Sequence, residues 1–144
     1  MWGSDGGQSD AITQTAEWGR AIPSGDTPYI AMDGRTVYKW ASGFISEATQ
    51  QVLDAAGVTA EQLDVFIPHQ ANHRITAAML RALKLPANVV VARTIKHYGN
   101  NSAASVPMAM DALLASGEAK SGQTALLIGF GAGLVYAGQV VTLP

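Results

Sequence analysis

The segment Pro68–Ile75, with the sequence Pro-His-Gln-Ala-Asn-His-Arg-Ile, gathers side chains that can take part in chemistry. His69 can exchange a proton near neutral pH or donate a hydrogen bond, and Asn100 offers an amide N–H as a second donor. Together they could hold an oxygen that becomes negatively charged, provided the surrounding backbone fixes the tautomer of the imidazole. Local hydrogen bonding of a loop histidine and a turn asparagine is the alternative, and spacing alone leaves it open.

Metal binding is a poorer interpretation of the same segment. His69 and His73 are four residues apart, a spacing that can bind zinc on a helix, but no glutamate follows in the His-Glu-x-x-His manner. The chain also contains no cysteine, which excludes disulfides, thiolate metal sites and a cysteine nucleophile contributed by this chain. We therefore expect no metal ligands here.

The glycine-rich segment Gly129–Gly133 could be taken for a dinucleotide-binding fingerprint. The residues that follow it favour a strand, so no helix N-terminus is predicted for a pyrophosphate. A glycine-rich turn between strands can still bring backbone N–H groups close to a ligand, as an oxyanion hole requires. A tight hairpin without a ligand remains the alternative.

A buried strand and an amphipathic helix are predicted on either side of His69. Asp64–Ile67 is a short apolar strand that must end at Pro68, because proline lacks the N–H of a continuing ladder. From Asn72 onward, apolar residues recur at the spacing of one helix face. His69 is therefore expected in a strand-to-helix connection, where open α/β folds bind ligands.

The remaining periodicity predicts an α/β layered domain with a mixed sheet flanked by helices. One long helix is expected from Val37 to a stop at Gly57, and the pair Asp33-Gly34 is expected to form a turn before it. Residues 3–28 show little periodicity. Further strands are expected at Tyr29–Met32, Val89–Val91, Thr124–Ile128 and Leu134–Leu143, a capping box at Thr59–Gln62, and a helix from Val106 to Gly117.

Composition fits one globular domain of 144 residues, 48% of them hydrophobic. No apolar run reaches the length of a membrane span and no signal peptide is evident, so we expect a cytoplasmic protein without membrane or nucleic-acid partners. The charges are uneven, because no acidic residue lies between Asp64 and Asp111. An acidic partner and an ordinary solvated face both explain the cations in that window, which are Arg74, Arg81, Lys84, Arg93 and Lys96.

Three strings of residues together carry a family resemblance. Pro68–Ile75, Gly-Asn-Asn-Ser-Ala-Ala-Ser-Val-Pro at Gly99–Pro107, and Gly-Phe-Gly-Ala-Gly at Gly129–Gly133 closely resemble β-ketoacyl-acyl-carrier-protein synthase III. This family comprises thiolase-fold condensing enzymes that start type II fatty acid synthesis. The resemblance covers residues 1–144 but only the C-terminal half of the family. It implies a thiolase-like domain whose N-terminal half, bearing the nucleophilic cysteine, is absent, and a homodimeric enzyme.

The resemblance also assigns roles to individual residues. It implies that His69 and Asn100 are two members of a Cys-His-Asn triad, and that the backbone N–H of Ala132 is an oxyanion donor. The family more often has threonine at the position of Asn101. Carrier-protein contacts are implied at Gln70, Ala71, Asn72, His73 and Arg74, and the substrate or CoA pocket at Asn72, Gly34 and Phe130.

The implied reaction is a decarboxylative Claisen condensation of acyl-CoA with malonyl-acyl-carrier protein. Both thioesters are substrates, and no separate cofactor is expected. Because this chain has no cysteine, we expect it to be inactive alone and to come from a chain about twice as long. The alternatives are a non-catalytic fragment that binds the carrier protein or CoA, and a related synthase of the polyketide type.

Overall fold

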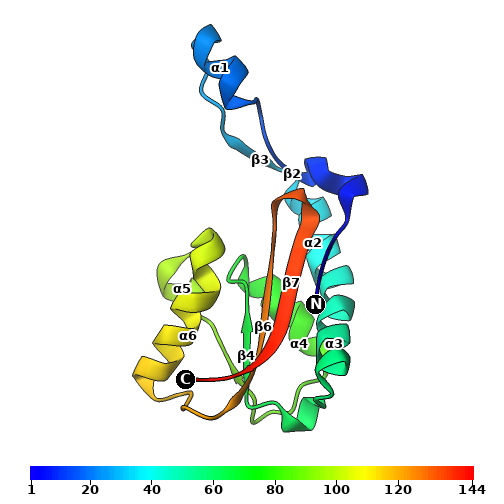
Figure 1. The fold of residues 1–144 in the computed structure, drawn as a ribbon, viewed down its shortest axis with the longest axis vertical. Coiled ribbons are helices and arrows are strands. Elements are labelled where there is room, and N and C mark those ends of the chain that lie inside the picture. Colours follow the sequence, from blue (N-terminus) through cyan, green and yellow to red (C-terminus); the bar gives the residue numbers. More distant parts are fainter.

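Strand β4 (Val65–Pro68) lies inside a five-stranded mixed sheet in the computed structural model, which describes residues 1–144. The strand order is β1-β7-β6-β4-β5 (Figure 1). Strand β4 pairs in parallel with β6 (Thr124–Gly131) and β5 (Val90–Val91), whereas β7 (Val135–Thr142) pairs antiparallel with β6 and with β1 (Trp2–Ser4). The predicted mixed α/β sheet is therefore confirmed.

Helices cover the two faces of this sheet unequally. On one face, α2 (Gly34–Ser42), α3 (Phe44–Ala56) and α4 (His73–Leu83) belong to a core that includes Phe66 and Leu126. On the other face, α6 (Ser105–Ser116) packs Ala109 and Leu113 against Val65 and Ile67 (Figure 1). The strand β4 is thus buried between two helix layers, which explains why all four of its residues are apolar and buried.

The long helix predicted before Gly57 is in fact two helices. They separate at Gly43, which leaves helical geometry with φ −99° and ψ −83°. The Asp33-Gly34 pair is also not a turn, since Asp33 caps α2 by accepting hydrogen bonds from the backbone N–H groups of Arg35 and Thr36. The bonds from Thr36 lower the pKa of the Asp33 carboxyl. Gly57 ends α3 in the left-handed conformation, as predicted.

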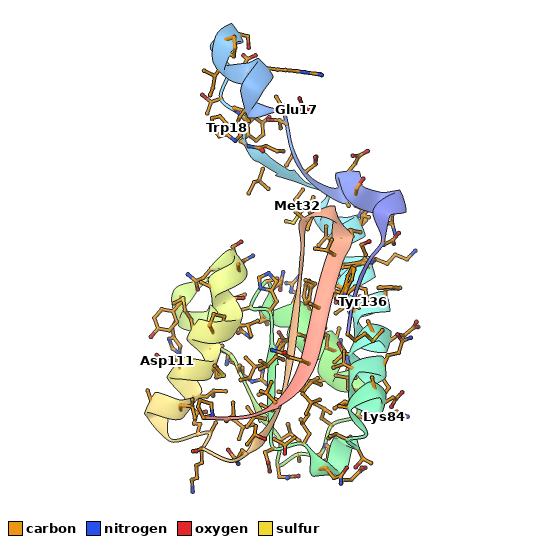
Figure 2. The ribbon with its side chains drawn as sticks, viewed as in Figure 1. Glu17, Trp18, Met32, Lys84, Asp111 and Tyr136 are labelled. Atoms are coloured by element: carbon orange, nitrogen blue, oxygen red, sulfur yellow. The ribbon has the colours of Figure 1, made fainter.

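The segment that lacked periodicity forms a projecting arm. After the 3-10 helix η1 (Gly6–Ala11), strand β2 (Ile12–Gln14) pairs antiparallel with β3 (Ile30–Met32), and α1 (Trp18–Ser24) stands at the far end (Figure 1). The strand predicted at Tyr29–Met32 is confirmed as β3, and η1, β2 and α1 lie in the segment before it that shows little periodicity. Trp18 lies in the arm and Met32 where the arm meets the body (Figure 2).

The other elements differ mainly at their ends. A capping box at Thr59 starts the short η2 (Ala60–Gln62) as predicted, and α6 ends at Gly117. The connection before α6 contains α5 (Ile95–Tyr98) and η3 (Ser102–Ala104), which the sequence did not predict. Strand β6 continues through Gly131, so the turn to β7 is the shorter η4 (Ala132–Leu134). The strand β5 is at a sheet edge.

None of the helices is long and apolar enough to cross a membrane.

Candidate active site at the end of strand β4

His69 follows directly on the last residue of β4, where the sheet still holds its backbone. Its N–H donates to the carbonyl of Ile128 on β6 at 2.7 Å, so the residue is fixed although the proline has ended the strand. The imidazole is half-buried, and burial lowers the pKa of His69 below its ordinary value of 6.5. The ring is therefore neutral at pH 7, with one nitrogen that donates and one that accepts.

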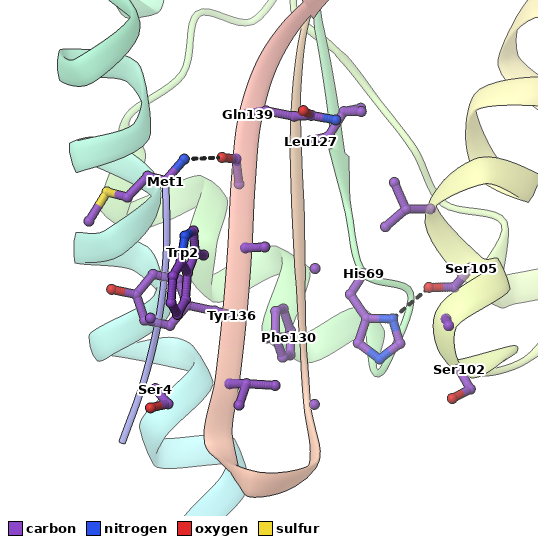
Figure 3. Close-up of a pocket in the computed structure, with 18 residues that line it drawn as sticks. Met1, Trp2, Ser4, His69, Ser102, Ser105, Leu127, Phe130, Tyr136 and Gln139 are labelled. Carbon is purple, nitrogen blue, oxygen red and sulfur yellow. Dashed lines mark hydrogen bonds between the residues drawn. The ribbon is translucent and has the colours of Figure 1, made fainter. Parts of the chain in front are cut away.

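Ser105, the first residue of α6, contacts His69 directly. The Nδ1 atom of His69 and the Oγ atom of Ser105 are 2.5 Å apart, and the backbone N–H of Gln70 donates to the same Oγ at 3.2 Å (Figure 3). Sequence reasoning did not single out Ser105. Its only signal was its place in the Gly99–Pro107 string, because a separation of 36 residues gives no spacing rule for a contact.

Phe130 lies on the other side of the imidazole. The two rings meet edge to face, with centroids 5.1 Å apart, and Phe130 is itself in edge contact with Trp40 of α2 at 6.2 Å. An aromatic ring beside the imidazole excludes water from it, which strengthens any hydrogen bond that the imidazole makes. The structure thus brings together two of the predicted site residues, His69 and Phe130.

An open cavity of about 950 Å³ begins at these side chains. It extends over the part of the sheet that α6 leaves uncovered, between α6 and strand β1 (Figure 3). The polar groups at its His69 end come from a strand end and a helix start, whereas its far wall is the β7 face and Trp2. The residues that line it include His69, Ser102, Ser105, Phe130, Tyr136 and Trp2.

Asn100 does not line the cavity. Its side chain is exposed and outside the cavity lining, and its Oδ1 accepts a hydrogen bond from the backbone N–H of Ser102 at 2.9 Å. Ser102 has φ 52°, an uncommon conformation for a residue other than glycine. The structure shows no hydrogen bond between Asn100 and His69, and the bond to Ser102 occupies only the Oδ1 acceptor of the amide. The pairing of imidazole and amide donors therefore stays a prediction.

The burial of Gln70 contradicts the prediction that its side chain contacts a carrier protein at the surface. Its side chain is only 1% exposed. The amide Nε2 donates to the carbonyls of Pro68 and Ala92 at 2.7 and 3.3 Å, and Oε1 accepts from the N–H of Ile95 at 3.2 Å. Gln70 therefore joins the end of β4 to the segments around β5 and α5. A glutamine in a mostly polar string carries no sequence signal for such burial.

The next four residues lead from the site to the protein surface. Ala71 is partly buried against the core, while Asn72, His73 and Arg74 are exposed. Asn72 caps α4 as its Oδ1 accepts from the N–H of Arg74 at 2.9 Å, which confirms the predicted helix start. The five cations of the window without acids are all exposed, and none of them forms a salt bridge.

Two other predicted residues, Gly34 and Ala132, do not line the cavity. Gly34 is the exposed first residue of α2 and does not line the cavity. Ala132 is in the exposed turn between β6 and β7, where Gly133 and Leu134 have φ values of 72° and 45°. Its neighbours Gly129 and Gly131 do line the cavity. The structure therefore places the glycine-rich segment at the site but leaves Gly34 outside it.

Comparisons with known proteins agree with this architecture. Residues 53–143 match the family described as 3-oxoacyl-(acyl-carrier-protein) synthase III C terminal. The β-ketoacyl-(acyl-carrier-protein) synthase III of Streptomyces glaucescens is 56% identical over 146 residues, which cover 100% of this chain and 44% of that protein. The chain therefore spans less than half the length of this curated relative.

Solved structures extend the likeness to the whole fold. A priming β-ketosynthase from a polyketide biosynthetic pathway superimposes with a TM-score of 0.95 at 41% identity, over 99% of this chain and 43% of that one. The 3-oxoacyl-(acyl carrier protein) synthase III of Pseudomonas aeruginosa gives a TM-score of 0.91 at 37% identity, over 100% of this chain and 44% of that one. These matches confirm the predicted thiolase-like fold.

We expect His69 to titrate below its ordinary pKa of 6.5 in the 144-residue chain, because burial disfavours the imidazolium. As the pH falls below about 6.5, the unfolded chain binds a proton at His69 before the folded chain does. The free energy of unfolding should therefore decrease as the pH is lowered, until the pH is below the pKa of His69 in the folded chain. NMR titration of the ring checks the pKa, and His69→Gln should remove this part of the pH dependence. A midpoint at or above 6.5 would contradict the prediction.

Replacing Gln70 with leucine should destabilise the 144-residue chain by about 2–4 kcal/mol, measured by urea unfolding. The substitution leaves the carbonyls of Pro68 and Ala92 and the N–H of Ile95 without their side-chain partner. The matched control is Gln50→Leu, since that exposed amide bonds only to Asp54, and we expect a change within about 0.5 kcal/mol. Equal effects of the two substitutions would show that the buried hydrogen bonds of Gln70 contribute nothing to the free energy of unfolding.

Proposed function

Because this chain belongs to the 3-oxoacyl-(acyl-carrier-protein) synthase III C-terminal family, we propose that residues 1–144 are the C-terminal thiolase-like domain of a condensing enzyme. The enzyme would join an acyl-CoA to malonyl-acyl-carrier protein by decarboxylative Claisen condensation, at the start of type II fatty acid synthesis. The observation that carries the proposal is His69, a neutral, half-buried donor between Ser105 and Phe130 at the edge of an open cavity.

The second half of the enzyme would supply the cysteine and cover the open sheet face. Trp2 is 84% exposed and Val135 is 48% exposed on the uncovered strands, and Met108 on α6 is 38% exposed. Apolar surface of this kind is costly to leave in water. We call the complex of this chain with the cysteine-bearing half the assembled enzyme, and we propose that it is a cytoplasmic homodimer. The two thioesters are its substrates, with no separate cofactor.

The condensation proceeds in two half-reactions. First, the cysteine thiolate attacks the acyl-CoA carbonyl, and CoA leaves as its thiolate. Second, the bond from the malonyl α-carbon to its carboxylate breaks, CO₂ departs, and the electron pair forms an enolate of the thioester. The α-carbon then attacks the acyl-cysteine carbonyl, a carbon–carbon bond forms, and the cysteine leaves as a thiolate.

His69 would act while the enolate forms. A neutral imidazole N–H directed at the malonyl thioester oxygen stabilises its developing negative charge, and exclusion of water by Phe130 strengthens this interaction. Asn100 would be the second donor, because the adjoining Ser102 already lines the cavity. Its Nδ2 donors remain available for this, because the bond to the N–H of Ser102 uses only the Oδ1 acceptor. The N–H of Ala132 would serve the cysteine thioester oxygen.

Carrier-protein docking would use the exposed surface that begins beside His69. Arg74 lies at the start of α4, with Arg81 in its last turn and Lys84 at its end. Ala71, Asn72 and His73 complete the rim, and Asn72 and Gly34 would contact the pantetheine arm or CoA while Phe130 walls the acyl pocket. Unpaired cations attract an acidic carrier from a distance and orient its flexible arm toward the cavity.

A non-catalytic fragment that binds the carrier protein or CoA is the competing function. It is favoured by one observation, the position of Asn100 outside the cavity. A synthase that primes polyketide chains would share the chemistry and differ in its product. The match to a priming β-ketosynthase supports this alternative. The following two experiments separate catalysis from binding.

His69→Ala in the assembled enzyme should lower the rate of malonyl decarboxylation by about 10²–10³-fold, the usual effect of removing one donor from an oxyanion site. Release of CO₂ from malonyl-acyl-carrier protein measures it. Binding of the carrier protein should be retained, and His97→Ala, at an exposed histidine, should leave the rate unchanged. Unaltered decarboxylation after His69→Ala would remove His69 from the mechanism and favour the binding fragment.

Arg74→Glu in the assembled enzyme should raise the apparent KM for malonyl-acyl-carrier protein by roughly 5–10-fold at low salt, because it reverses a charge at the docking rim. Acylation by a small acyl-CoA should change little. Arg81→Glu and Lys84→Glu should act in the same direction but more weakly with distance. The effect should shrink as salt screens the charges.

Lys120→Glu is the matched control for charge reversal. Lys120 precedes β6, and because β6 and β4 are parallel, it lies at the opposite end of the sheet from His69. It is also exposed, so its substitution changes the net charge without touching the rim. If Arg74→Glu impaired both half-reactions equally, or if Lys120→Glu had the same effect, Arg74 would not be a specific carrier contact.

A further inference from the structure

The Ser105 hydroxyl is a buried group with two neighbours of different kinds. The residue is 1% exposed, so water cannot satisfy its hydroxyl from the surface. Its Oγ lies 2.5 Å from Nδ1 of His69 and accepts the N–H of Gln70 at 3.2 Å. Apart from Nδ1 of His69, the structure shows no hydrogen-bond acceptor for this Oγ. The Oγ therefore accepts one hydrogen bond, from the Gln70 N–H. Whether it donates to His69 Nδ1 or accepts from it depends on which atom carries the hydrogen.

A serine hydroxyl carries one hydrogen and two lone pairs. The Gln70 N–H occupies one lone pair, and His69 Nδ1 is the only atom in reach of the hydroxyl hydrogen. If Nδ1 carried a hydrogen instead, the buried serine hydrogen would have no acceptor, which is costly in free energy. The favourable arrangement has the Ser105 hydroxyl donating to Nδ1. The neutral imidazole then carries its hydrogen on Nε2, the nitrogen that Ser105 does not contact (Figure 3).

We propose that Ser105 is a positioning residue that holds His69 as its Nε2–H tautomer and so presents a donor to the substrate oxygen. This inference rests on the function proposed above, since it deepens the role of His69 in that reaction. Ser105 does not touch the reacting atoms. It acts by selecting which of the two imidazole nitrogens donates, because only a donor at Nε2 can stabilise negative charge that develops in the cavity.

The support for Ser105 comes from two separate elements, which makes the arrangement rigid. Its backbone begins α6, and its Oγ is held by the peptide N–H that follows His69. That peptide belongs to Gln70, whose buried side chain is bound to Pro68, Ala92 and Ile95. The imidazole is held from its other side by the edge of Phe130. Rotation of the ring would therefore break contacts with both the sheet and α6.

The test uses the assembled enzyme with ¹⁵N-labelled histidine, in which NMR shifts of the ring nitrogens report the tautomer. Wild-type His69 should be the Nε2–H form, and the signal that disappears in His69→Gln identifies it. Ser105→Ala should give a mixture of both tautomers and lower kcat for malonyl decarboxylation about tenfold, the rate equivalent of one ordinary hydrogen bond. KM for malonyl-acyl-carrier protein should stay within about twofold, because the docking surface is untouched. Ser105→Thr, which keeps the hydroxyl, should restore both signals.

Ser116→Ala is the matched control on the same helix. The Ser116 hydroxyl bonds only to the Leu113 carbonyl and to Glu118, so its loss should change neither the tautomer nor kcat. An Nδ1–H form in the wild-type protein would overturn the proposal even if Ser105→Ala failed to fold. An unchanged Nε2–H signal in folded Ser105→Ala would also overturn it. By contrast, decarboxylation that is indifferent to His69→Ala would overturn the proposed function while leaving the tautomer measurement intact.

Discussion

The burial of β4 between two helix layers is the constraint on which the rest of the structure depends. A strand covered on both faces must be apolar, and a proline at its end leaves no donor for a further ladder position. The chain therefore changes from apolar to polar within one residue, at the end of a strand that has neighbours on both sides. His69 is placed there with its backbone still bound to β6, so its side chain has a fixed origin.

The polar groups beyond β4 divide into a buried set and an exposed set. Gln70 and Ser105 are buried. The Gln70 side chain bonds to backbone carbonyls, and the Ser105 hydroxyl bonds to the imidazole of His69. Asn72 and Arg74 turn outward, the first capping α4 and the second free in solvent. The six residues His69–Arg74 therefore connect the buried side chains around His69 to the exposed rim.

The cavity beside His69 is open on the side away from α6. Phe130 shields one edge of His69, but the space over β7 and β1 is open to solvent. Hydrogen bonds to a developing charge are strong only where water is excluded. Asn100 is exposed, and the bond that its Oδ1 accepts from the N–H of Ser102 lies within its own loop.

Much of the fold was predictable from local pattern: β4, β6, α4, the mixed sheet and the glycine stop at Gly57 all follow from periodicity, proline and capping rules. The break at Gly43 and the role of Asp33 as a cap were missed, because turn and cap use the same residue types. By itself, the sequence determined that His69 stands at a strand end. Only the tertiary structure decided that Ser105 binds it and that Gln70 is buried, since such pairings depend on how distant segments pack and leave no trace in spacing.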